Sequence, residues 1–96
     1  MKISRVIGTA ISTIKDEKVR GSKLLIVRQT DHAGEIIGDP YVAVDLVDAG
    51  VDDLVLTGEG SSARQTYQTK ECPVDAVVIA VIDHLEVDGE VVFRKT

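Results

Sequence analysis

Residues that could do chemistry are few and widely spaced in this 96-residue chain. A glycine turn, Gly58-Glu59-Gly60, leads into Ser61 and Ser62. Two glycines before a serine-capped helix can form a nest of backbone amides for an anion. The fuller phosphate-loop and dinucleotide motifs are absent from the sequence, so a tight turn followed by a helix cap explains the same residues. Both an anion site and a purely structural turn are therefore compatible with the pattern.

The other reactive side chains show no catalytic or metal-binding spacing. His32 and His84 are not spaced to share a metal ion with a second ligand, and the single Cys72 has no base close to it in the sequence. Ser61 and Ser62 do not sit in the G-x-S-x-G elbow of a hydrolase. We therefore expect no catalytic residue, no metal site and no cofactor, and a protein that is not an enzyme.

Short strands separated by turns must position these residues. Stretches rich in β-branched side chains occur at 2–14, 24–27, 41–47, 54–57 and 76–82. Gly8 indicates a bend in the first of them, and Pro40 is expected to open the third. Asp88-Gly89, between Leu85-Glu86-Val87 and Val91-Val92-Phe93, is typical of a two-residue hairpin turn.

One helical segment follows the glycine turn. Ser62 and Gln65 fit a capping box, which predicts a short helix from Ala63 to about Gln68. Together these elements predict a mainly β fold, a small OB-like barrel of five to six strands with one short helix and a C-terminal hairpin, forming a single domain over residues 1–96. The residues expected to build its core are Val6, Leu25, Val44, Leu56 and Val78.

The stretch 76–82 is apolar on both faces of the predicted strand. One face is expected to join the core, which leaves Val77, Ile79 and Val81 on the other. A chain this short buries only about 60 to 68% of the surface that its unfolded form exposes. We therefore expect this second face to meet another subunit.

Composition excludes several classes of partner. The net charge is -5, and aromatic residues are only 3% of the chain, so both the basic surface and the stacking platform of nucleic-acid-binding proteins are missing. No stretch approaches the roughly 18 apolar residues of a membrane span. The single cysteine and the absence of a signal-peptide pattern favour the cytoplasm. We expect no nucleic-acid and no membrane partner.

An ordered set of short motifs resembles the EutN/CcmL family of bacterial microcompartment vertex proteins along nearly the whole chain. The motifs are Val6-Ile7-Gly8-Thr9, Gly21-x-Lys23-Leu24-Leu25-x-Val27, Val42-Ala43-Val44-Asp45, Asp48-Ala49-Gly50, Gly58-x-Gly60-Ser61-Ser62-Ala63-Arg64, Pro73-Val74-Asp75-Ala76 and Ile82-Asp83. The resemblance implies a structural protein with an OB-like barrel. It implies a homopentamer at the fivefold vertices of a microcompartment shell in the cytoplasm, beside hexameric shell proteins.

The resemblance also implies a place for the glycine turn, at the subunit interface or beside the central opening of the ring. The residues concerned are Gly58, Gly60, Ser61, Ser62, Ala63 and Arg64.

Two other classes of function remain open on the residues alone. One is an OB-type binding module for nucleic acid or a small ligand, and the other is a small enzyme.

Overall fold

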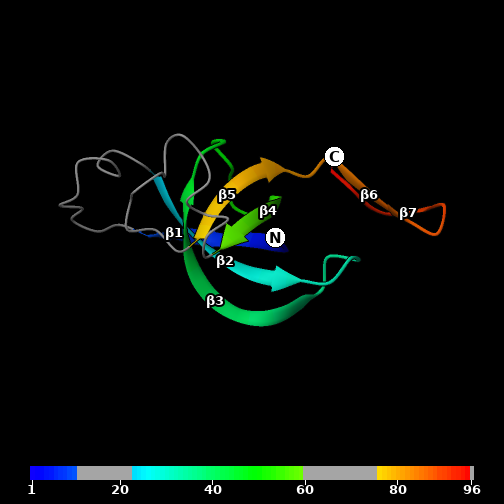
Figure 1. Cartoon of the computed structure of the whole chain (residues 1–96), viewed down its shortest axis with the longest axis horizontal. Helices are drawn as coiled ribbons and strands as arrows, with labels where there is room; N and C mark the ends of the chain where they lie inside the picture. The colour runs from blue at the N-terminus through cyan, green and yellow to red at the C-terminus, as the bar shows by residue number, and fades with distance from the viewer. Residues whose placement is uncertain (11–22, 60–75, 96) are drawn as a thin grey trace.

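A computed structural model describes residues 1–10, 23–59 and 76–95, which form seven strands (Figure 1). The strands are β1 Lys2–Ala10, β2 Lys23–Thr30, β3 Ile36–Asp45, β4 Leu54–Glu59, β5 Ala76–Val81, β6 His84–Val87 and β7 Glu90–Arg94. Within these ranges, no helix is long and apolar enough to cross a membrane. The short helix predicted at 63–68 lies outside the described residues.

Five strands close into a barrel in the order β1-β2-β3-β5-β4. Neighbouring strands are antiparallel except β3 and β5, which run parallel. A register shift between Val6 and Gly8 interrupts the pairing of β1 with β2. This irregularity confirms the bend expected at Gly8, and Figure 1 shows β2 and β3 curving around the barrel. The predicted OB-like barrel is therefore confirmed.

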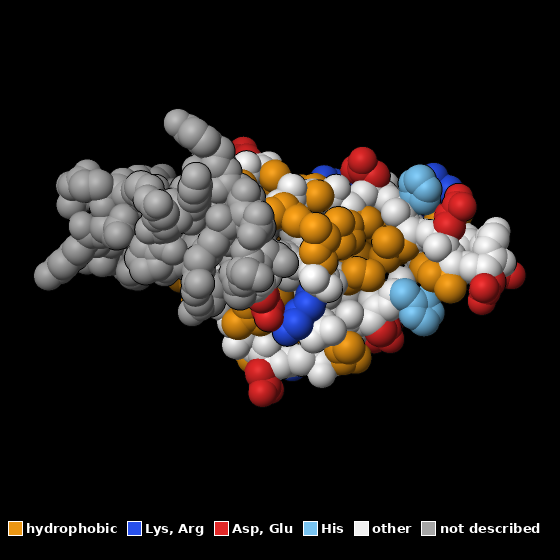
Figure 2. Space-filling view, in the orientation of Figure 1, with side chains coloured by type: hydrophobic (Ala, Val, Ile, Leu, Met, Phe, Trp, Pro, Cys, Tyr) orange, Lys and Arg blue, Asp and Glu red, His pale blue; other side chains and the backbone are white. Residues whose placement is uncertain are grey.

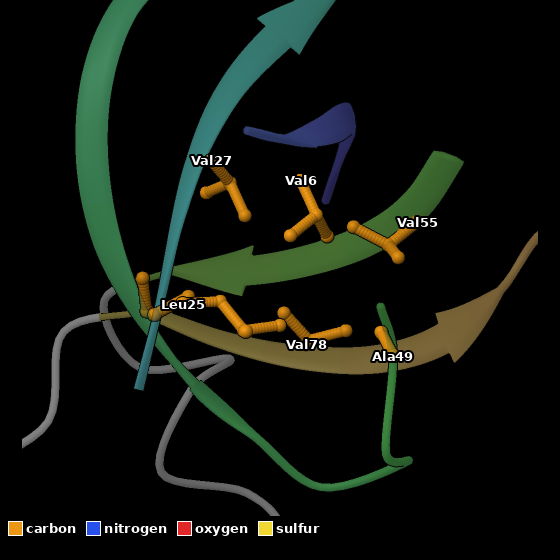
Figure 3. Close-up of a cluster of buried hydrophobic side chains, with 8 residues drawn as sticks. Val6, Leu25, Val27, Ala49, Val55 and Val78 are labelled. Carbon is orange, nitrogen blue, oxygen red and sulfur yellow. The ribbon is translucent and has the colours of Figure 1, made fainter. Parts of the chain in front are cut away.

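The core lies inside the barrel and draws on all five of its strands. Its buried side chains are Val6, Leu25, Val27, Ala43, Ala49, Val55, Ala76 and Val78. In Figure 3 the labelled members of this cluster converge from different strands on one space. Val44 and Val77 form a second, smaller cluster with Leu24, Leu46 and Ile79. The core positions expected at Val6, Leu25 and Val78 are thus confirmed, and Val44 is buried in the second cluster.

The core position predicted for Leu56 is wrong. Val55 points into the barrel and is fully buried, and the next residue along a strand faces the opposite side. Leu56 is accordingly only partly buried and contributes to a groove on the outer surface. Because residues 54–56 are all large and apolar, their pattern does not indicate which of them faces inward.

Three strands extend well beyond their predicted ends. The second strand, expected at 24–27, runs from Lys23 to Thr30. The third strand begins at Ile36 rather than at Pro40, which lies within β3 opposite Arg28. The register between β2 and β3 shifts directly after this pair, and an irregular position is where a strand tolerates proline. Strand β4 continues through Gly58 and Glu59, which were expected to form a turn. The strand extends this far because β5 begins directly opposite these two residues.

Two turns connect neighbouring strands, and the one at Asp88-Gly89 follows the sequence prediction. Asp88 and Gly89 have φ angles of 53° and 81°, the left-handed values that a type I′ hairpin turn requires at both positions. Between β2 and β3, Oδ1 of Asp31 accepts hydrogen bonds from the amides of Ala33 and Glu35 at 2.9 and 3.0 Å. The Glu35 amide, and then the Ala33 amide, hold the pKa of the Asp31 carboxyl below its ordinary value of 3.8.

The turn after β3 is organised by a buried carboxylate. The side chain of Asp45 is 1% exposed, and its oxygens accept hydrogen bonds from the amides of Val47 at 3.1 Å and Ala49 at 2.9 Å. Lys23 Nζ lies 3.3 Å from Asp45 Oδ2 and donates to the Ala49 carbonyl at 2.7 Å. A hydrogen bond to the exposed Asp48 is the main reason why the pKa of Lys23 lies above its ordinary value of 10.5. The Asp45 carboxylate therefore joins the end of β3 to the turn that follows it.

Three hydroxyl groups meet between β1, β3 and β4. The Tyr41 hydroxyl lies 2.7 Å from Ser4 Oγ and 2.8 Å from Thr57 Oγ1, and both Ser4 and Thr57 are fully buried. In the part of the chain that the structure describes, every buried polar side-chain atom has a hydrogen-bond partner. These hydrogen bonds thus offset the free-energy cost of burying the three hydroxyl groups.

Replacing Asp45 with asparagine should destabilise the barrel. Asp45→Asn leaves one acceptor oxygen for two backbone donors and no charge opposite Lys23, so the free energy of unfolding should fall by about 2 to 3 kcal/mol. Asp48→Asn is the matched control, because the Asp48 side chain is 96% exposed and should change stability by less than about 0.5 kcal/mol. Urea unfolding at one fixed protein concentration measures both. Equal losses in the two variants would contradict this role for Asp45.

Asp31 should contribute stability only above a defined pH. Its folded pKa lies below the unfolded value of 3.8, so the contribution is complete above that value and disappears as the pH falls through the folded pKa. The stability difference between wild type and Asp31→Asn should therefore be constant from pH 7 to about pH 5 and shift toward the variant below about pH 4. A series of unfolding curves from pH 7 to 2 tests this, and a pH-independent difference would disprove it.

Candidate assembly surfaces

The predicted assembly loop is anchored at both ends by paired strands. Gly58 is buried in β4 opposite Val77, and Glu59 pairs with Ala76 at the start of β5. The segment 60–75 therefore leaves and re-enters the barrel at neighbouring positions. The other predicted residues of this loop, Gly60, Ser61, Ser62, Ala63 and Arg64, lie outside the described residues, as does Cys72.

A bulge in β5 separates the three residues that were expected to form one interface. The pairing of β5 with β4 passes from Val78 to Ala80 and skips Ile79. One extra residue in a strand reverses the faces of those that follow. Val77 and Ile79 therefore belong to the second cluster, whereas Val81 packs against the main core. The strand alternation used for the prediction does not hold across the bulge.

Val77, Ile79 and Val81 differ in how much of each side chain is exposed in a single subunit. Val77 is 0% exposed in the single subunit, so it has no surface left to bury against a partner. Ile79 and Val81 are partly exposed. Of the three, only Ile79 and Val81 can contribute new buried area on assembly, and they do so from opposite faces of β5.

An apolar groove of about 410 Å³ lies on the outside of the barrel, where β1, β4 and β5 approach the start of β6. Figure 2 shows hydrophobic side chains gathered on this face. Asp83 and His84 line the groove together with six apolar residues, which are Ile3, Leu56, Ala80, Val81, Ile82 and Leu85. Sequence reasoning missed this groove because its residues come from three separate stretches of the chain, at Ile3, Leu56 and 80–85.

The C-terminal hairpin continues the groove with one apolar face. Leu85 pairs directly with Phe93, and paired residues lie on the same side of a sheet. Val87 is two residues beyond Leu85 and shares that face, where it pairs with the exposed Glu90. The opposite face carries His84 and Glu86, whose side chains are exposed and lie 3.7 Å apart. The alternation of apolar and charged residues at 84–87 was the sequence signal for this amphipathic hairpin.

A second groove, of about 440 Å³, is lined by both polar and apolar residues, and its lysine is paired with its glutamate. Lys2 Nζ lies 3.1 Å from Glu59 Oε1 and 5.5 Å from the centre of the Tyr41 ring. Elsewhere, His32 is exposed in the turn between β2 and β3. Across residues 1–10, 23–59 and 76–95, no group of three His, Cys, Asp or Glu residues could hold a metal ion.

Comparison with known sequences relates the chain to shell proteins. The family described as "Ethanolamine utilisation protein EutN/carboxysome" matches residues 1–83. The carboxysome shell vertex protein CcmL of Synechococcus elongatus is 44% identical over 95 residues, which cover 99% of this chain and 96% of that protein. The bacterial microcompartment shell vertex protein EutN of Salmonella typhimurium is 38% identical over the same share of each.

Solved structures agree with the sequence matches. CcmL of Nostoc sp. superposes with a TM-score of 0.89 at 41% identity, over 99% of this chain and 100% of that one. The GrpN pentameric microcompartment shell protein of Rhodospirillum rubrum superposes with a TM-score of 0.80 at 38% identity, over 91% and 99%. The barrel order and these matches together place the chain in the EutN/CcmL family.

Proposed function

We propose that this protein is a vertex protein of a bacterial microcompartment shell and that it assembles as a homopentamer. The observation that carries the proposal is the likeness, over nearly the whole chain, to proteins named as shell vertex proteins and to one described as pentameric. The role is structural and not enzymatic. It places the protein in the shell of a microcompartment, within the cytoplasm.

The geometry of a closed shell requires pentamers. A layer of hexameric tiles is flat, and it closes into a polyhedron only where fivefold positions replace sixfold ones. The neighbours of this protein in such a shell are therefore hexameric shell proteins. A ring of identical subunits is held by a head-to-tail interface, so each subunit must present two different complementary surfaces.

The proposed interface includes β5 and the segment that precedes it. Ile79 and Val81 offer apolar surface that is only partly buried in one subunit, with Val77 supporting Ile79 from beneath. The residues from Gly58 to Arg64 are proposed to lie at the same interface or beside the central opening. The support for this second part is the family resemblance and the anchoring of Glu59 beside Ala76.

The purified chain should have the mass of five subunits. Native mass spectrometry at micromolar concentration is the direct measurement, because the apolar surface of β5 should favour association at this concentration. Six subunits would retain ring assembly but contradict a fivefold role. A mass of one or two chains would refute the proposal altogether.

Reversal of the charge at position 64 should dissociate the ring. Arg64→Glu places a carboxylate where we propose a partly desolvated guanidinium pair, and breaking such a pair costs about 3 to 5 kcal/mol. Arg94→Glu is the control, since Arg94 is an exposed residue of β7. Size-exclusion chromatography should show smaller particles only for Arg64→Glu, with the far-ultraviolet circular dichroism of both variants unchanged. An unaltered elution volume for Arg64→Glu would remove this arginine from the interface.

A further inference from the structure

We propose that the second side of β3, over residues 36–42, is protected against pairing with a strand of another chain, and that Pro40 provides this protection. A protected edge is a surface that must stay free. It therefore lies outside the assembly contacts proposed above and does not depend on them.

Beyond its short contact with β5, β3 is paired on one side. Its pairs with β5 begin only at Val44, and among the described residues the stretch 36–42 pairs with β2 alone. In Figure 1, β3 runs along the outline of the molecule with β2 beside it. We call the side of residues 36–42 that faces away from β2 the β3 edge. Backbone amides and carbonyls on such an edge form a template onto which a strand of another molecule can add.

The side chains of this stretch favour such an addition. Ile36, Ile37 and Val42 are 40%, 62% and 52% exposed, and the exposed Asp39 interrupts them with a charge. Exposed β-branched side chains beside an unpaired edge promote association between strands of different molecules. In a ring the edge occurs once in every subunit, so an unprotected edge would join one ring to others.

Proline at position 40 removes a hydrogen-bond donor from the β3 edge. The Leu46 amide donates to the Val78 carbonyl at 3.3 Å, so it points toward β5. Amides alternate between the two sides along a strand, which places the backbone nitrogens of Val44, Val42 and Pro40 on the same side as that of Leu46. Proline has no N–H. Pro40 therefore costs the edge one donor and costs the ladder with β2 none.

The backbone next to Pro40 blunts the same edge. Between its pairs at Pro40 and Ile36, β3 has more residues than β2, which contributes only Gln29, so β3 bulges there. Nε of Arg28 donates to the Gly38 carbonyl at 2.7 Å and already serves that acceptor. Prolines, bulges and charges are the means by which natural proteins keep sheet edges from pairing. Their coincidence on one stretch indicates an edge that has to remain unpaired.

Restoring the missing amide tests this protection on the full chain. Pro40→Thr adds a donor to the β3 edge and a side chain that favours strands. Light scattering over a concentration series measures the result. At the highest concentration, the average mass of Pro40→Thr should reach at least about twice that of wild type, because strands of different assemblies can now pair. An unchanged mass for Pro40→Thr would overturn the proposal.

The matched control is Val42→Pro in the Pro40→Thr background. This double variant removes the donor at the next position of the same edge, again without loss of a hydrogen bond to β2. It has as many edge donors as wild type, so its average mass should return to the wild-type value. Equal association of the single and the double variant would show that the missing amide is not the cause, and would reject the role of Pro40.

Hydrogen exchange of the assembled wild type is a second test and decides the matter if Pro40→Thr loses its β-sheet circular dichroism. The Val42 amide faces the β3 edge, whereas the amides of Tyr41 and Ala43 face β2. The Val42 amide should therefore exchange at least about tenfold faster than either neighbour. Equal protection of the three amides would show that the edge is already paired and would reject the proposal.

Discussion

Closure of the barrel depends on the short parallel contact between β3 and β5. Only two residue pairs make this contact, Val44 with Val77 and Asp45 with Val78, and parallel pairing is the less stable kind. The buried Asp45 carboxylate stands at this point and binds the amides of the next turn, while Lys23 joins it from β2. One hydrogen-bonded charge therefore joins β2, the end of β3 and the following turn where the sheet is narrowest.

The small size of the barrel explains why so much apolar surface remains outside it. Its core has room for one layer of short side chains, mostly valine and alanine. The outward faces of β4 and β5 also carry apolar residues, including Leu56 and Ile79, and these are only partly buried in one subunit. Assembly into a ring would bury this surface between subunits, and that burial would add to the stability that the modest core provides.

Much of the fold could be predicted because the relevant signals are local. Asp88-Gly89 specifies a turn through backbone angles that glycine readily adopts, and Gly8 marks a strand bend. The failures share a different cause. Residues 54–56 are apolar on both faces, so nothing in the pattern distinguishes Val55 from Leu56. The strand positions of Gly58 and Glu59 depend on the partner strand β5, which lies far along the chain.

The candidate assembly surface was less predictable than the fold. Val77, Ile79 and Val81 alternate in the sequence, but the bulge at Ile79 places them on different faces. The outer groove joins residues from β1, β4, β5 and β6, and only the closed barrel brings these together. An apolar strand predicts that a partner exists. Where that partner binds depends on tertiary pairing.

The central claim is that identical subunits close into a ring of five, with unlike surfaces in contact. Electron cryomicroscopy of the purified chain tests this directly, because it reports both the symmetry and the position of each strand. We expect a fivefold ring in which every subunit contributes β5 to the boundary with a neighbour. A twofold dimer that pairs like surfaces, or isolated monomers, would contradict it.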